Sequence, residues 1–273
     1  MSKAVSVVLG GACEKTGKAG RAVPNEGIQG EEKRKAAAKT SGALPLRVSI
    51  GYAAAAAQEI CGDTAISCGL PDGSLALILS DGMGQGIRAA AGSRILVRRL
   101  RRNLKSGQAP AAAIKEVNSY MIAHESGGKA ESFATLDLLI IDRKGGKAKF
   151  YKMGAATSFL IRNGEVREFE KAALPIGIIP RLRTGQIACR LHEGDTLVMV
   201  SDGITEADSR DLAGTWLPEL LGQLFARSEQ GSTAAAMSAR QLARSIMQEA
   251  AAHCTAAEGD DRTVAVVKIM PSF

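Results

Sequence analysis

The chain has 273 residues, a formal net charge of +7, 45% hydrophobic residues and 23% charged residues. This composition is that of a globular protein, and the length suits one large domain or two small ones. Only 4% of the residues are aromatic, so binding of nucleic acid through base stacking is not expected. No apolar run approaches the roughly 20 residues needed to span a bilayer, and no membrane partner is expected either.

The cysteines and histidines exclude several kinds of site. The five cysteines include no Cys-x-x-Cys pair, which argues against a disulfide framework or a zinc site and favours a reducing, cytoplasmic location. The three histidines, His124, His192 and His253, are isolated from one another in the sequence. A serine–histidine–aspartate triad is therefore not expected, and each histidine is interpreted as a structural or surface residue.

Two regions of different character follow one another along the chain. Residues 1–45 are rich in Gly, Ala, Lys and Glu and are interpreted as a flexible basic N-terminal extension. Residues 46–273 form the predicted folded domain. Its expected strands are 46–52, 75–80, 133–142, 147–153, 158–162, 165–169, 185–191, 195–201 and 263–270. Its expected helices cover residues 85–104, 109–123, 217–226 and 232–252.

Two of the predicted strand connections are typical hairpin turns. Asn163-Gly164 is a strong signal for a two-residue turn, and Lys144-Gly145-Gly146 joins another pair of strands. Hairpins imply antiparallel pairing. Groups of strands interrupted by pairs of helices therefore favour an α+β layered domain over a doubly wound parallel sheet.

Four short acidic motifs, each beside a glycine, are the most informative feature of the sequence. They are Cys61-Gly62-Asp63, Ser80-Asp81-Gly82, Ser201-Asp202-Gly203 and Gly259-Asp260-Asp261. A single Asp-Gly pair after a strand is usually just a turn, since both residues favour turn conformations. Four together, two of them the same tripeptide after similar apolar strands, favour an oxygen-rich cage at one rim of a sheet. Hard divalent cations such as Mg²⁺ or Mn²⁺ prefer oxygen ligands of this kind.

The set of motifs resembles the PPM-type metal-dependent serine/threonine phosphatases, and within them the stage II sporulation protein E phosphatase-domain subfamily. The matching segments follow the family's order and are 62–63, 80–86, 133–137, 174–177, 201–207 and 260–264. This resemblance implies an αββα sandwich of two antiparallel β-sheets flanked by helices. It also implies two metal ions, Mn²⁺ or Mg²⁺, at one end of the sandwich.

The resemblance assigns a role to each candidate ligand. Asp81 would bridge the two ions. The backbone carbonyl of Gly82 and the side chain of Asp63 would bind one ion, and Asp202 and Asp260 would hold the other. The four aspartates are thus the candidate catalytic residues as well as candidate metal ligands.

Three nearby residues are left outside the ligand set. Asp261 is expected to support the ligands without binding an ion. Asp137 is interpreted as a strand residue that faces outward. Arg262 stands where the subfamily often carries Met, a departure at the rim of the site.

The resemblance implies a protein phosphatase that hydrolyses phosphoserine or phosphothreonine through attack of a metal-bridging hydroxide. No histidine or cysteine catalyst is then needed. By analogy with the subfamily, the substrate would be a small phosphoprotein of a sigma-factor circuit, such as an anti-sigma-factor antagonist.

The basic segment 88–105 supports an alternative. It contains several arginines and no acidic residue, which is typical of a solvated helix face or of a docking surface for an acidic or phosphorylated partner. The alternative function is therefore a non-catalytic docking module on the same fold. A regulatory partner or a homodimer is also expected, because a partner that shifts the helix 85–104 would move Asp81 and Gly82.

Overall fold

The computed structural model describes residues 45–84, 86–125, 133–208, 211, 214–229, 234–254 and 260–271. The predicted extension, residues 1–45, lies outside these ranges except for Pro45. Among the residues described, no helix is both long and apolar enough to cross a bilayer.

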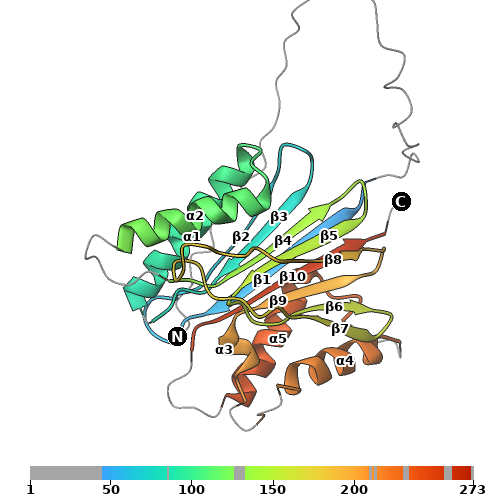
Figure 1. Cartoon of the computed structure of the whole chain (residues 1–273). Helices are drawn as coiled ribbons and strands as arrows, with labels where there is room; N and C mark the ends of the chain where they lie inside the picture. The colour runs from blue at the N-terminus through green and yellow to red at the C-terminus, as the bar shows by residue number, and fades with distance from the viewer. Residues whose placement is uncertain are drawn as a thin grey trace, which may run out of the picture.

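Two five-stranded antiparallel sheets are stacked face to face (Figure 1). Sheet I has the strand order β1 (Arg47–Ala55), β10 (Arg262–Met270), β9 (Thr196–Val200), β6 (Ser158–Arg162) and β7 (Glu165–Phe169). Sheet II has the order β2 (Thr64–Gly69), β3 (Leu75–Ser80), β4 (Leu136–Asp142), β5 (Lys147–Met153) and β8 (Gln186–Arg190).

Helices cover the outer face of each sheet (Figure 1). Over sheet II lie α1 (Gly86–Lys105) and α2 (Pro110–Glu125), and on the side of sheet I lie α3 (Asp202–Thr205), α4 (Trp216–Glu229) and α5 (Ala239–His253). The α+β class and the predicted αββα sandwich are thus confirmed.

The strands separate three apolar layers because successive side chains point to opposite faces of a sheet. In β3, Leu77 and Leu79 pack between the sheets, whereas Ile78 packs beneath α1 and α2. Val198 and Val266 of sheet I likewise pack against α4 and α5. The apolar side chains of the inter-sheet layer are mostly aliphatic and include the stacked rings of Phe150 and Phe169 and the partly buried Tyr52.

The predicted hairpins are present. Asn163 and Gly164 both have positive φ values, 51° and 82°, as a type I′ turn between β6 and β7 requires. The turn between β4 and β5 is held by Asp142, whose Oδ1 accepts hydrogen bonds from the backbone N–H groups of Lys144 and Gly145.

Three elements differ from the sequence-based expectation, and one of them is the short helix α3, which was not predicted. Strand β2 was not predicted, because it is an edge strand with half-exposed side chains and no clear apolar alternation. Helix α5 begins at Ala239, not at residue 232. Residues 234–237 instead form a turn, whose carbonyls at Ala234, Ala235 and Met237 accept hydrogen bonds from the buried ammonium group of Lys268.

A capping box sets the start of α5. The Ser238 hydroxyl accepts a hydrogen bond from the Gln241 N–H (3.2 Å), and the Gln241 side chain accepts one from the Ser238 N–H (2.9 Å).

We expect Ser238→Ala to lower the free energy of unfolding by about 1 kcal/mol, measured by urea denaturation. Ser119→Ala, in the exposed middle of α2, is the control and should change stability little; equal effects of the two variants would contradict the capping role.

Candidate metal centre

The first candidate ligand, Asp63, lies directly before β2 on a loop that Asp261 holds. The carboxylate of Asp261 accepts hydrogen bonds from the N–H groups of Gly62 (2.6 Å) and Ala57 (2.8 Å). The Gly62 carbonyl in turn accepts a hydrogen bond from the buried hydroxyl of Ser93 on α1 (2.5 Å). Asp261 therefore fixes the backbone next to Asp63.

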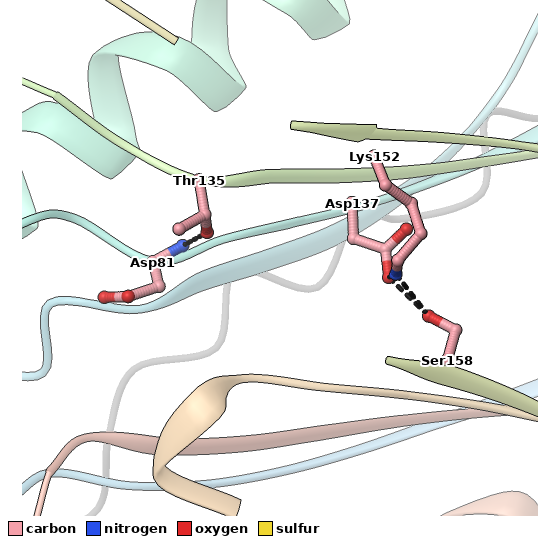
Figure 2. Close-up of polar contacts among 5 residues, drawn as sticks. All are labelled: Asp81, Thr135, Asp137, Lys152 and Ser158. Carbon is pink, nitrogen blue, oxygen red and sulfur yellow. Dashed lines mark hydrogen bonds and ion pairs between the residues drawn. The ribbon is translucent and has the colours of Figure 1, made fainter. Parts of the chain in front are cut away.

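The second motif, Asp81-Gly82, follows β3 and is tied to the segment before β4. The Asp81 N–H donates to the Thr135 hydroxyl (2.9 Å), and the Thr135 N–H donates to the Asp81 carbonyl (2.8 Å). Figure 2 shows the Asp81 amide facing Thr135. A Cβ atom added at Gly82 would lie only 1.8 Å from the Ala89 carbonyl oxygen of α1. Glycine is thus required here, because the turn and the helix backbone touch.

The remaining two motifs come from sheet I. Asp202 begins α3 directly after β9, and its Oδ1 accepts a hydrogen bond from the Gly203 N–H (2.9 Å). Asp260 lies shortly before β10 and accepts from the Asp261 N–H (2.7 Å). The Ser201 hydroxyl accepts from the Thr263 N–H (2.8 Å) and so joins the end of β9 to the start of β10.

The four aspartates share one end of the sandwich: Asp81 and Asp202 line one small pocket, the turns that carry Asp63 and Asp81 lie side by side, and Asp261, next to Asp260, is bonded to the Gly62 N–H. Burial raises the pKa of Asp63 to about 7, partly offset by nearby hydroxyl groups. Burial, followed by the negative charges of Asp202, Asp63 and Asp260, raises the pKa of Asp81 to about 8. Burial and then Asp260 raise the pKa of Asp202. Two sheets thus contribute mutually repelling carboxylates to one site.

The donor set fits hard divalent cations. Both carboxylate oxygens of Asp63 are buried and, among the described residues, have no hydrogen-bond partner of normal geometry, which buried polar atoms rarely lack. Within the described ranges, no three acidic, cysteine or histidine side chains form a ready-made metal-binding group. Because like charges repel, a bound cation would have to draw these carboxylates together.

Asp137 differs from its sequence-based interpretation. It does not face outward: it is 1% exposed and lies between the sheets, where Oδ2 contacts the ammonium group of Lys152 at 2.5 Å. The strand 136–142 has apolar residues on both faces, so its sequence pattern did not reveal the side on which Asp137 lies.

The cysteine and histidine side chains of the described region show no catalytic arrangement. Cys61 is buried, and burial together with Asp63 and Asp261 raises the pKa of its thiol to about 12, so it stays protonated and inert at neutral pH. The His253 ring is tilted against the ring of Trp216, with ring centroids 5.0 Å apart. The side chain of His124 lies outside the described ranges.

The sequence model of the family described as stage II sporulation protein E (SpoIIE) matches residues 71–270. The chain belongs to this family. The stage II sporulation protein E of Bacillus subtilis (strain 168) is 33% identical over 229 residues, which cover 82% of this chain and 26% of that protein. The chain thus spans about a quarter of the length of this SpoIIE relative.

Solved structures of similar proteins have the same fold as this chain. A structure of the PP2C phosphatase domain and a fragment of the regulatory domain of SpoIIE from Bacillus subtilis is 31% identical. It matches with a TM-score of 0.72 over 84% of this chain and 65% of that chain. The RsbU and RsbW domains of Rv1364c from Mycobacterium tuberculosis share the fold, with 21% identity and a TM-score of 0.70 over 84% of this chain and 63% of that one. The chain therefore has the PP2C-type phosphatase fold of the SpoIIE family.

The raised pKa values predict how the metal-free SpoIIE-family domain responds to pH. A carboxylate whose pKa is higher in the folded state than in the unfolded state stabilises the fold at low pH and loses that contribution as the pH rises. We expect the unfolding temperature in EDTA to fall between pH 5 and pH 8, and to fall less for Asp81→Asn. Identical pH profiles for the two proteins would contradict the crowding of ionised carboxylates.

The contact between Gly82 and the α1 backbone predicts that a larger residue at position 82 destabilises the fold. Gly82→Ala should lower the free energy of unfolding by roughly 1–3 kcal/mol or more, because the added methyl group overlaps the α1 backbone. Gly92→Ala is the matched control: its Cβ would lie 3.5 Å from the nearest carbonyl, and Ala favours a helix interior by about 1 kcal/mol. Denaturant midpoints that fall equally for both would show that the Gly82 contact is not special.

Proposed function

We propose that this domain is a metal-dependent phosphatase that removes phosphate from serine or threonine of a phosphoprotein. The observation that carries the proposal is the convergence of Asp63 and Asp81 from sheet II with Asp202 and Asp260 from sheet I. Bound Mn²⁺ or Mg²⁺ would activate water as the nucleophile and neutralise charge on the phosphate. Similar solved domains are described as phosphatases, including the SpoIIE domain of Bacillus subtilis.

Each candidate ligand is assigned to one or both of the two proposed ions. After burial, the negative charges of Asp202, Asp63 and Asp260 all raise the pKa of Asp81, which suits a bridging position between the two pairs of ligands. The Gly82 carbonyl lies 3.6 Å from where a Cβ of Gly62 would stand. The turns at Gly62 and Gly82 therefore lie side by side, so that Asp63 and the Gly82 carbonyl could bind the same ion. Asp202 and Asp260 would hold the other ion.

The proposed substrate is an acidic phosphoprotein of a sigma-factor circuit, such as an anti-sigma-factor antagonist. Support comes from the family and from the exposed basic face of α1, formed by Arg88, Arg94, Arg98, Arg102 and Lys105. Arg99 does not belong to this face, because it pairs with Glu116 (3.8 Å) and lies over the ring of Tyr120. A regulatory partner could act through the same helix, since α1 contacts both glycine turns through Ala89 and Ser93.

Hydrolysis of p-nitrophenyl phosphate tests the proposed function. We expect turnover that requires added Mn²⁺, and a loss of about 100-fold or more in kcat/KM for Asp81→Asn, equivalent to at least about 2.7 kcal/mol. Asp72→Asn, in the exposed turn between β2 and β3, should behave like the wild type. Full Mn²⁺-dependent activity in Asp81→Asn would reject the ligand assignment.

The exposed arginines of α1 favour one alternative, a docking module without catalysis. Charge reversal of Arg94, Arg98 and Arg102 separates the two ideas. An enzyme should keep its activity on the small ester while losing activity on an acidic phosphoprotein. A docking module should bind such a partner through α1 and show no turnover with any divalent ion.

A further inference from the structure

A buried polar cluster lies between the sheets beside the candidate metal centre (Figure 2). The Lys152 ammonium donates to Asp137 Oδ2 (2.5 Å) and to the Ser158 hydroxyl (2.9 Å), and the Ser158 hydroxyl donates to the same Asp137 oxygen (2.5 Å). All three residues are at most 1% exposed. None of them belongs to the proposed ligand set.

Strand register connects this cluster to the metal centre. Asp137 of β4 pairs with Leu79 of β3 on one side and with Lys152 of β5 on the other. Asp81 lies two residues beyond Leu79, and it is bound to Thr135, two residues before Asp137. Side chains two residues apart share a face of a sheet, so Asp81 and Asp137 both face the opposing sheet.

Asp81 and Asp137 line one small pocket, in which the Asp81 carboxylate points away from Asp137 (Figure 2). Its polar lining residues are Asp81, Thr135, Asp137, Ser201 and Asp202, and the rest of the lining includes the small side chains of Ala155 and Ala156. The second oxygen of Asp137, Oδ1, is buried and has no hydrogen-bond partner among the described residues. A buried carboxylate oxygen normally has one, and water is a common partner in a polar pocket.

We propose that Asp137 is a positioning residue for the metal centre, a role that rests on the function proposed above. Water in the pocket donates a hydrogen bond to Oδ1 of Asp137 and continues the hydrogen-bonded chain through the polar groups that line the same pocket to the ligand Asp81 or Asp202. That chain fixes the orientation of the ligand carboxylate toward the ion. Lys152 and Ser158 hold Asp137 in place through its other oxygen.

Two other roles fit the contacts less well. A further cation on Asp137 would lie close to the ammonium group of Lys152, and like charges repel. A purely structural ion pair explains Oδ2 but leaves Oδ1 without a partner. Moreover, a buried ion pair stabilises a fold no better than apolar packing of the same volume, so its place beside the metal centre points to a role there.

The test compares two Asp137 variants with a control. Asp137→Asn removes the charge, and the double variant Asp137→Asn/Lys152→Met also removes the ammonium group that would be left uncompensated in the core. The control is Asp195→Asn: Asp195 is also 1% exposed and pairs with Arg162 (2.8 Å), but it does not line the pocket. Mn²⁺ affinity is measured by electron paramagnetic resonance of free Mn²⁺, and stability by thermal unfolding in EDTA.

We expect both Asp137 variants to bind Mn²⁺ about 10-fold more weakly or worse, as when a residue supporting a metal ligand is removed. The double variant should recover thermal stability relative to Asp137→Asn without recovering Mn²⁺ affinity. Asp195→Asn should lose stability and keep the wild-type affinity. Wild-type affinity in the folded double variant would overturn the proposal, since it would leave Asp137 with a structural role only.

Mn²⁺ binding and hydrolysis by the wild-type protein distinguish the positioning role of Asp137 from the proposed phosphatase function. A wild-type protein that binds no Mn²⁺ and hydrolyses nothing overturns both. A wild-type protein that binds Mn²⁺ and is active, beside an Asp137→Asn/Lys152→Met variant of equal affinity, overturns only the positioning role. Ser158→Ala gives a second check that keeps the ion pair; it should weaken Mn²⁺ binding in the same direction, and an unchanged affinity also counts against the proposal.

Discussion

Crowding of negative charge at one end of the sandwich is the constraint on which the rest of the structure depends. The carboxylates repel one another, and burial makes that repulsion costly, as the raised pKa values of Asp63 and Asp81 show. The surrounding backbone must therefore be held firmly. Asp261, Ser201 and Thr135 provide this through hydrogen bonds to the turns that carry the aspartates.

Helix α1 completes this support from the outer face of sheet II. It touches the Gly82 turn directly through the backbone of Ala89, and it holds the Gly62 carbonyl through Ser93. The two turns lie far apart in the sequence but share one helix as their neighbour. The same helix buries Leu96 and Leu100 in the outer apolar layer, so the position of the site is linked to the packing of that layer.

Much of the fold was predictable because the local signals agree with the final packing. The Asn163-Gly164 turn and the apolar runs of β3 and β9 have clear patterns, and the acidic motifs at their ends could be found from residue order alone. Strand β2 was not predicted because an edge strand buries few side chains. The start of α5 was misplaced because the turn before it is bound by Lys268, which is distant in the sequence.

The buried position of Asp137 was predictable from β5, although not from β4 itself. The apolar residues of β4 occupy both faces of the strand and do not fix its orientation. In β5, however, Lys147 and Lys149 alternate with Ala148 and Phe150, and this alternation puts Lys152 on the buried face. A buried lysine needs an acidic partner, because an unpaired charge in the core is costly. In the antiparallel register, Asp137 lies opposite Lys152.

The order of the strands has a consequence for how the chain is made. Strand β10, the last strand described, lies between β1, the first, and β9. Strands β1 and β9 of sheet I therefore stay separate until β10 has been made and inserted between them. Asp260 and Asp261 enter with that strand. Contacts of such long sequence separation form slowly, so a partly made chain would carry Asp63, Asp81 and Asp202 without Asp260, and the site would be completed only when β10 is in place.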